Sequence, residues 1–174
     1  MSIPPLPIPD SYWVIPGQLL AGRYPGASSE TETRLKLTRF LDHGINHFTD
    51  LTQKGDILAY QPHLEELAAE KGMQVDYQRF PISDLGIPAD SDMIAILDWI
   101  DAGLQAGRKV YVHCFGGLGR TGVVVGCYLV RHGMTGGQAL ERIAVLRRDM
   151  PGWWMRSPEM EDQREMVLSW QTGK

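Results

Sequence analysis

The sequence predicts an α/β domain built on a central, mostly parallel sheet that is flanked by helices. Short strand-like runs alternate along the chain with longer runs that have helical spacing. The run 109–113 (KVYVH) is short and β-branched, and a glycine-rich stretch leads from it into an apolar run with the length of a helix. In sheets of this kind ligands bind beyond the carboxyl ends of the strands, so we expect the chemistry where 109–113 ends.

Four runs are expected to form strands, because they are short, rich in apolar or β-branched residues and bounded by turn residues. They are residues 18–21, 45–51, 73–80 and 109–113. Six runs are expected to form helices from their apolar spacing, their helix-forming residues or a glycine at their end. They are residues 30–43, 64–71, about 91–106, 121–132, about 136–148, and a last one between Pro158 and about Trp170. Ser91 or a neighbouring aspartate is expected to cap the third helix, and the fourth is apolar nearly all round, which predicts burial.

Length and composition indicate one globular domain. The chain has 174 residues, of which 43% are hydrophobic and 22% charged, which is ordinary for a folded domain and argues against disorder. Four of the first ten residues are prolines, which forbid regular helix. We therefore expect residues 1–11 to form an extended arm on the surface and residues 12–174 to form a single domain.

Charge and the absence of targeting signals exclude several classes of protein. A formal charge of −4 lacks the basic balance of a dedicated nucleic-acid binder. The first residues have neither the charges nor the apolar run of a secretory signal. The longest nearly apolar segment, 123–130, has eight residues, whereas a membrane-spanning helix needs about 20. Two cysteines are too few for a disulfide scaffold. We expect a cytoplasmic, monomeric protein with reduced thiols and no membrane span.

The run 113–121 (HCFGGLGRT) carries the most informative pattern in the sequence. Three glycines follow the cysteine within five residues, and they allow successive N–H groups to turn inward as an anion-binding nest. The helix that opens next adds its unpaired N–H groups and the positive end of its dipole. We therefore expect this loop to bind phosphate. The phosphate-binding residues are expected to be Phe115, Gly116, Gly117, Leu118, Gly119 and Arg120.

The same positive environment stabilises a thiolate, so Cys114 is expected to be an ionised nucleophile. Arg120 has a planar guanidinium suited to two phosphate oxygens. Thr121 is expected to donate its hydroxyl to the sulfur, and His113 to shape the loop through hydrogen bonds to backbone. The alternative, a glycine-rich turn around a buried structural cysteine, accounts for fewer of these residues together.

The run HCFGGLGRT resembles the HCxxGxxR[ST] signature of the cysteine-dependent protein phosphatases, and the compact chain resembles their dual-specificity branch. The GGLGR portion is especially similar to the cyclin-dependent-kinase-associated phosphatases. Residues 12–17 (YWVIPG), 50–52 (DLT) and 80–84 (FPISD) also resemble segments of bacterial and archaeal members. The resemblance therefore covers most of residues 12–170 and implies a protein-tyrosine-phosphatase-like fold.

The resemblance also implies a two-step mechanism without a metal or other cofactor. Cys114 attacks phosphorus while a carboxylic acid protonates the leaving oxygen, and the same carboxylate then activates water. Family members carry this acid on a loop about thirty residues before the cysteine, and Asp84 lies thirty positions before Cys114. Asp90 and Asp92 lie on the same stretch but are expected to cap the following helix. The five histidines show no metal-ligand spacing.

Several other residues admit two interpretations. Cys127 is expected to be a core residue, and the alternative is a disulfide with the oxidised nucleophile. Gln163 resembles a glutamine that positions water in some members, but a solvated helix residue is expected. Trp153 and Trp154, with arginines around them, either rim the pocket or pack a long loop on the domain. Arg79 either guides an anionic substrate or lies on an exposed strand face.

The loop composition bears on the substrate. No basic residue precedes Arg120 between Phe115 and Gly119, which favours a singly phosphorylated protein or peptide, with phosphotyrosine first and phosphoserine or phosphothreonine also possible substrates. A phosphoinositide or another small phosphomonoester is the alternative substrate. A phosphopeptide-binding module without turnover is a second alternative. Sulfur transferases and arsenate reductases use a similar cysteine loop but match this chain less well.

Overall fold

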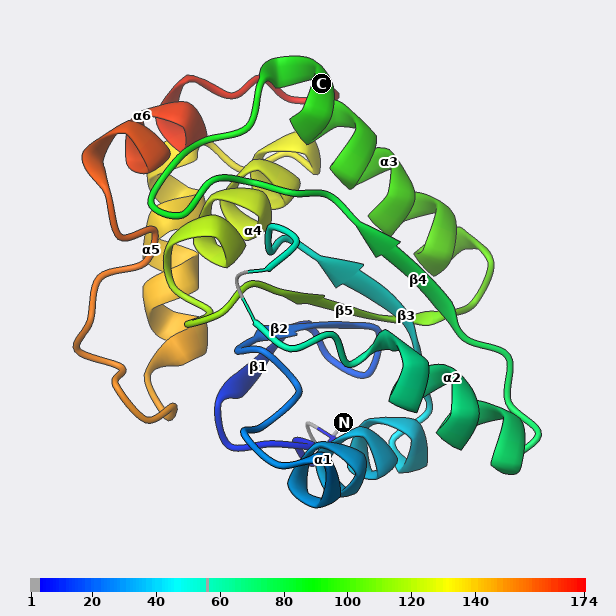
Figure 1. Ribbon diagram of the computed structural model, residues 1–174. Coiled ribbons are helices and arrows are strands. Elements are labelled where there is room, and N and C mark those ends of the chain that lie inside the picture. Colours follow the sequence, from blue (N-terminus) through cyan, green and yellow to red (C-terminus); the bar gives the residue numbers. More distant parts are fainter. Residues whose placement is uncertain (1–3, 56) are drawn as a thin grey trace.

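The computed structural model describes residues 4–55 and 57–174, in which the chain forms five strands and six helices around one sheet (Figure 1). The strands are β1 (Ser11–Ile15), β2 (Leu19–Gly22), β3 (Ile45–Asp50), β4 (Asp76–Arg79) and β5 (Lys109–His113). The helices are α1 (Glu30–Asp42), α2 (Gln61–Glu70), α3 (Asp90–Gln105), α4 (Gly119–Arg131), α5 (Gly136–Arg147) and α6 (Glu161–Ser169). The predicted α/β class is confirmed.

The sheet has the strand order β1-β2-β5-β3-β4. The pair β1 and β2 is antiparallel, whereas the β2–β5, β5–β3 and β3–β4 pairs are parallel. The sheet is therefore mostly parallel, as predicted. Because β5 occupies the middle position, the segment that follows it leaves the sheet at its centre.

Two hydrophobic cores cover the two faces of the sheet, because side chains alternate along each strand. Val110 and Val112 face the larger core, which contains residues of α3, α4, α5 and α6. Tyr111, between them, faces the smaller core with α1 and α2. Figure 1 shows this division, with α1 and α2 on one side of the sheet and the other helices on the opposite side. Helix α4 is buried along nearly its whole length, as its sequence predicted.

The four parallel strands end in one row. Gly22 at the end of β2 is paired in register with His113 at the end of β5, which is also paired with Asp50 of β3. Asp50 is in turn paired with Arg79 of β4. This register places the ends of three strands beside the residue that precedes Cys114, so side chains from distant segments meet there.

The beginning of the chain departs from the prediction. Residues 1–3 of the expected arm lie outside the described residues. The next residues bend and pack on the domain: Ile8 is buried, and the indole of Trp13 donates a hydrogen bond to the Pro4 carbonyl at 3.0 Å. Ser11 already belongs to β1, a strand that the sequence analysis did not predict. It was missed because it forms the antiparallel edge of the sheet and has no helix before it.

Helix α3 is not capped as expected. Its N-cap is Ala89, which has no side chain able to accept a hydrogen bond, and Asp90 and Asp92 lie inside the first turn. They stabilise the helix through its dipole rather than through a cap. Helix α2 begins at Gln61, with a proline in its first turn, three residues before the predicted start. In the part of the chain that the structure describes, no helix is both long and apolar enough to cross a bilayer.

Candidate active site

Cys114 lies on the loop that joins β5 to α4, at the carboxyl edge of the sheet. Its side chain is 3% exposed, and its Sγ accepts a hydrogen bond from the backbone N–H of Gly117 at 3.2 Å. Gly117 has a φ of +73°, a conformation that L side chains rarely adopt. The loop therefore curls around the sulfur, as the spacing of its glycines predicted.

The loop is anchored on the end of β2. The N–H of Tyr24 donates to the Phe115 carbonyl at 3.1 Å. A Cβ atom on Gly117 would lie 2.7 Å from the carbonyl carbon of Gly22 and 2.9 Å from the nitrogen of Arg23. A residue with a side chain therefore does not fit at position 117 unless the backbone moves.

The backbone of the loop provides donors for an anion. Among the described residues, the N–H groups of Phe115, Gly116, Leu118 and Gly119 have no hydrogen-bond partner. Helix α4 begins at Gly119, so the free N–H groups of its first turn lie at the same place. Donors grouped in this way at a helix start suit a phosphate.

Arg120 joins the loop to the stretch that carries the predicted acid. It is 4% exposed, and its Nη1 donates to the Ile82 carbonyl at 3.1 Å. Its Nη2 lies 3.3 Å from Oδ1 of Asp84, whose side chain is 74% exposed. The structure thus brings the three predicted catalytic residues, Cys114, Arg120 and Asp84, to the walls of one cleft of about 230 Å³.

Asp84 lies on a tight turn, closed by a hydrogen bond from the Gly86 N–H to the Ser83 carbonyl at 2.9 Å. Leu85 has a φ of +60° and is the one residue other than glycine, among those described, with a positive φ. A bulky residue in that conformation costs about 1 kcal/mol or more. Its side chain is 48% exposed, so little burial compensates.

Gln163 holds this turn to the rest of the domain. Its Nε2 donates to the Gly86 carbonyl at 3.0 Å, and its Oε1 accepts from the Met160 N–H at 3.1 Å. The residue is 0% exposed. The expectation of a solvated helix residue is therefore wrong. The sequence analysis missed this burial because Gly86 lies far from Gln163 in the sequence.

His113 is buried directly before the nucleophile and has hydrogen-bond partners on both ring nitrogens. Nδ1 lies 3.0 Å from the Cys114 carbonyl, and Nε2 lies 2.7 Å from the Tyr60 hydroxyl. A carbonyl only accepts, so Nδ1 carries the proton. Burial lowers the pKa of His113, so the ring is neutral and Nε2 accepts from Tyr60. Burial also raises the pKa of Tyr60, which keeps its donor proton. His113 contacts loop backbone, as predicted, and Tyr60 was not predicted.

A buried carboxylate lies at the same edge of the sheet and was also missed as a site residue. Asp50 is 1% exposed, and its Oδ2 accepts from Tyr77 at 2.6 Å and from Arg79 Nη2 at 3.2 Å. Burial alone would raise the pKa of Asp50, but His113 and the hydrogen bonds from Tyr77 and Thr52 outweigh it and hold the pKa low. Arg79 is therefore committed to Asp50. The signal available in the sequence was an aspartate at the end of a strand parallel to 109–113.

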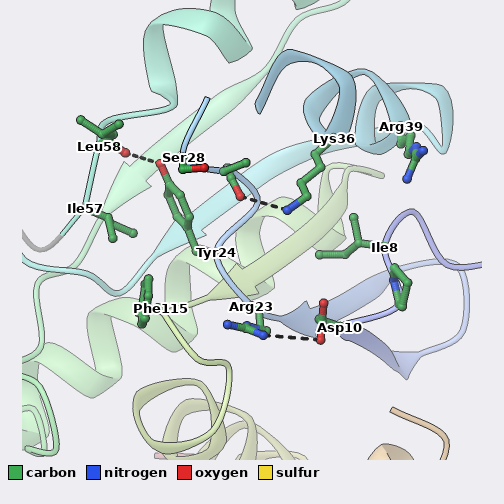
Figure 2. Close-up of a pocket in the computed structure, with 13 residues that line it drawn as sticks. Ile8, Asp10, Arg23, Tyr24, Ser28, Lys36, Arg39, Ile57, Leu58 and Phe115 are labelled. Atoms are coloured by element: carbon green, nitrogen blue, oxygen red, sulfur yellow. Dashed lines mark hydrogen bonds and ion pairs between the residues drawn. The ribbon is translucent and has the colours of Figure 1, made fainter. Parts of the chain in front are cut away.

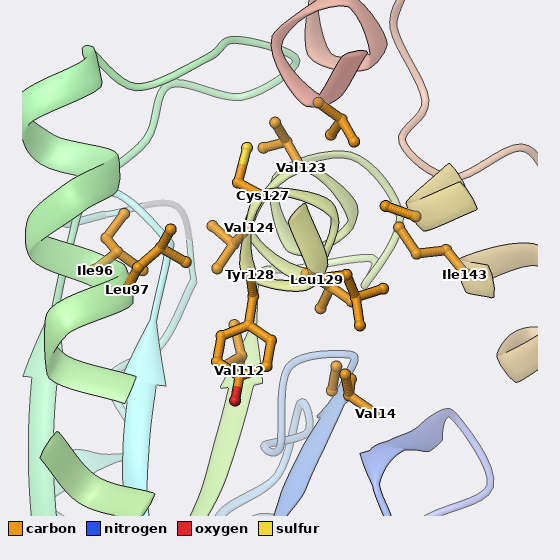
Figure 3. Packing of buried hydrophobic residues seen from close by; sticks show 14 of the residues in the cluster. Val14, Ile96, Leu97, Val112, Val123, Val124, Cys127, Tyr128, Leu129 and Ile143 are labelled. Carbon is orange, nitrogen blue, oxygen red and sulfur yellow. The ribbon is translucent and has the colours of Figure 1, made fainter. Parts of the chain in front are cut away.

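Thr121 does not make its predicted contact. Its hydroxyl is buried and has no hydrogen-bond partner among the described residues, so it does not donate to Cys114. Cys127 is a core residue on α4, as expected (Figure 3), and burial raises the pKa of its thiol. Trp153 and Trp154 line a separate cavity with Arg156 rather than the cleft of Cys114.

Glu159 lines the cleft and was not predicted as a site residue. Gly117 was predicted to bind phosphate, but it does not line the cleft and instead supports the sulfur. Among the described residues, no three His, Cys, Asp or Glu side chains are grouped as metal ligands would be.

The curated relatives that match are phosphatases and related proteins, and most of each lies outside the match. Cyclin-dependent kinase inhibitor 3 of Sus scrofa is 32% identical over 88 residues, which are 50% of this chain and 41% of that protein. An uncharacterised protein of Methanocaldococcus jannaschii is 40% identical over 65 residues, which are 37% of this chain and 44% of that protein. The chain thus matches less than half the length of these relatives.

Solved phosphatase structures have the same fold over nearly the whole chain. The structure described as Tk-PTP in the active form has a TM-score of 0.71 and 25% identity, and covers 91% of this chain and 94% of that one. The structure described as PTPMT1 in complex with PI(5)P has a TM-score of 0.64 at 20% identity, and covers 90% of this chain and 94% of that one. The second comparison shows the fold alone.

A family profile described as "Polymorphic toxin system, DSP-PTPase phosphatase" matches residues 23–134. This range holds β2 to β5, the turn of Asp84, the loop of Cys114 and helix α4. The resemblance to cysteine-based dual-specificity phosphatases is thereby confirmed. The chain belongs to this dual-specificity and tyrosine phosphatase family.

Proposed function

We propose that the chain hydrolyses phosphomonoesters on proteins or peptides through a phosphocysteine at Cys114. The observation that carries the proposal is the meeting of Cys114, Arg120 and Asp84 in one cleft, with free loop N–H groups beside them. These are a nucleophile, a group for the equatorial oxygens and a proton carrier, which are the parts that this chemistry requires.

In the first step the Cys114 sulfur forms a bond to phosphorus and the bond from phosphorus to the substrate oxygen breaks. Asp84 in its protonated form gives its proton to that oxygen, so the substrate leaves as a neutral hydroxyl. In the second step water attacks phosphorus, Asp84 takes a proton from the water, and the S–P bond breaks. Inorganic phosphate and the free thiolate result, with no cofactor required.

Arg120 and Asp84 act in sequence on the same site. The ion pair between them, 3.3 Å from Nη2 to Oδ1, occupies a guanidinium edge that a phosphate would bind. When phosphate oxygens take this edge, Asp84 is released beside a dianion, and the negative charge favours its protonated form. Substrate binding thus converts a paired carboxylate into a general acid.

His113 and Gln163 position the reacting groups. His113 donates to the carbonyl of the nucleophile residue and thereby fixes the start of the loop. Gln163 binds the Gly86 carbonyl and thereby fixes the end of the acid's turn. Neither side chain needs to transfer a proton.

The proposal is tested by turnover of para-nitrophenyl phosphate and of phosphotyrosine, phosphoserine and phosphothreonine peptides, with reductant and EDTA present. Wild type should release phosphate, and Cys114→Ser should release none. A rapid-quench digest of wild type should contain the Cys114 peptide with one added phosphoryl group. A chain that binds phosphopeptides tightly but releases no phosphate would instead be a binding module, which would overturn the proposal.

A further inference from the structure

A second cavity lies next to the catalytic cleft and shares Phe115 with it. The cavity has a volume of about 560 Å³ and is formed by the chain after β2, helix α1 and the segment before α2 (Figure 2). Phe115 lines both hollows and is 51% exposed. Tyr24, another lining residue, is held to the catalytic loop through the Phe115 carbonyl. A ligand that passes over Phe115 therefore enters both.

The charge of this cavity is opposite to that of the chain. Arg23, Lys36 and Arg39 line it, against the single acidic residue Asp10, so the lining carries three positive charges and one negative, a net +2. The chain as a whole has a formal charge of −4. Such a local reversal of charge attracts an anionic ligand to this place on the surface.

The three cations are not equally committed. Arg23 lies 3.8 Å from Asp10, and Lys36 lies 3.4 Å from Glu32. Arg39, on an exposed position of α1, has no ion pair among the described residues. Figure 2 shows Lys36 and Arg39 extending from the same helix, on the side of the cavity away from Phe115 and Ile57. Arg39 is thus the cation most available to a ligand.

The remaining wall is apolar. Ile57, Leu58 and Phe115 line the cavity, with Leu58 71% exposed. The Leu58 carbonyl accepts a hydrogen bond from the Tyr24 hydroxyl, which ties this segment to the chain after β2. A ligand that fills the cavity would bury these side chains while its charged end reached α1. The lining thus suits a ligand with an apolar part beside an anionic one.

We propose that this cavity is a substrate subsite that binds an anionic group and a neighbouring apolar side chain of a phosphorylated peptide. The inference rests on the proposed function and names its substrate class: phosphopeptides with an acidic residue or a second phosphate near the scissile one. An inositol phospholipid headgroup is fully polar and leaves the apolar wall unmatched, so the lining favours a peptide. Selection is electrostatic, through Lys36 and Arg39.

The test compares Arg39→Gln with the matched control Arg142→Gln, which removes the same charge from an exposed position of α5, outside both hollows. Each protein is assayed with three phosphotyrosine peptides, carrying a neutral, a glutamate or a second phosphorylated neighbour at each flanking position in turn. The readout is kcat/KM for each peptide divided by kcat/KM for para-nitrophenyl phosphate. Inositol phospholipid vesicles form a further arm.

Arg39→Gln should lower the ratio about three- to tenfold for an anionic peptide, and Lys36→Gln with Arg39→Gln should lower it further. The neutral peptide and Arg142→Gln should show no such loss. A larger effect with the second phosphate would identify phosphate as the ligand, and an equal effect a carboxylate; both support the subsite. Equal ratios for Arg39→Gln and Arg142→Gln overturn it, as does preferred, Arg39-dependent turnover of the lipid.

Failure of the subsite and failure of the proposed function are separable. Peptide binding to Cys114→Ser, measured by fluorescence anisotropy, reports on the subsite without turnover. If wild type releases no phosphate while Arg39→Gln weakens binding of the anionic peptide to Cys114→Ser, the catalytic proposal fails and the subsite stands. If wild type turns over and binding is unchanged, the subsite fails alone.

Discussion

The carboxylate of Asp84 lies against the guanidinium of Arg120, with Oδ1 3.3 Å from Nη2, although the two side chains differ greatly in exposure. Arg120 is fixed within the domain, whereas Asp84 lies on a turn in contact with solvent. The pair therefore joins a rigid anion-binding group to an acid that is free to move when phosphate takes its place.

Replacing Asp84 by asparagine should remove the proton donor without removing the turn. We expect kcat/KM to fall by roughly 10²–10⁴-fold for substrates with poor leaving groups, and by less for good ones, which need no protonation. The measurement is the dependence of rate on leaving-group basicity. Asp92→Asn, in the first turn of α3, is the control. Equal dependence for wild type and Asp84→Asn would remove Asp84 from this role.

Two adjacent glycines should respond oppositely to alanine. A Cβ on Gly117 would meet backbone at 2.7 Å and would be strained at φ +73°, whereas nothing lies within 4 Å of a Cβ on Gly116. Gly117→Ala should lower the free energy of unfolding by about 1–3 kcal/mol and disturb the hydrogen bond to Cys114. Gly116→Ala should change it by less than about 0.5 kcal/mol. Denaturant unfolding of both variants decides, and equal losses would contradict this account.

Two buried tyrosines form a similar pair. Tyr60→Phe removes the donor to His113 Nε2 and leaves that nitrogen unsatisfied, which should cost about 1–3 kcal/mol of unfolding free energy. The Tyr12 hydroxyl is buried without a partner among the described residues, so Tyr12→Phe should be neutral or stabilising. Denaturant unfolding of the two variants again provides the measurement. A Tyr60→Phe protein as stable as Tyr12→Phe would show that the His113 contact contributes nothing.

Stability should fall as the pH is lowered from 7 towards 5. Burial lowers the pKa of both His113 and His47 below the usual 6.5. Below about pH 6.5 the unfolded chain therefore binds protons that the folded chain does not, which favours unfolding. The pKa of Asp50 is held below its usual 3.8, so its contribution is lost only in stronger acid. Unfolding free energies measured at several pH values check the sign, and stability that rises towards pH 5 would refute it.

The catalytic loop was predictable because its parts are contiguous. Residues 113–121 carry the nucleophile, the glycines and the arginine on one strand-to-helix junction, and local rules describe such a junction well. The strand and helix pattern followed for the same reason, with errors at element ends. β1 escaped because its pairing with β2 is antiparallel, and an isolated short strand has little signal.

The supporting residues were not predictable because they meet only in the folded sheet. Tyr60, Asp50 and Gln163 come from three distant segments, and their burial depends on the register of β3, β4 and β5 and on the docking of α6. Thr121 shows the converse error. Its position in the motif suggested a bond to sulfur, but the helix directs its hydroxyl elsewhere.

The central position of β5 has a consequence for how the two halves of the site fluctuate. Its amides are hydrogen-bonded to β2 on one side and β3 on the other, and they exchange with deuterium only when the whole domain opens. The Ser83–Gly86 turn, closed by a single backbone bond, exchanges through local opening. The nucleophile is thus mounted on the slowest-exchanging part of the protein and the acid on one of the fastest, so dynamics at the acid can change without loosening the phosphate cradle.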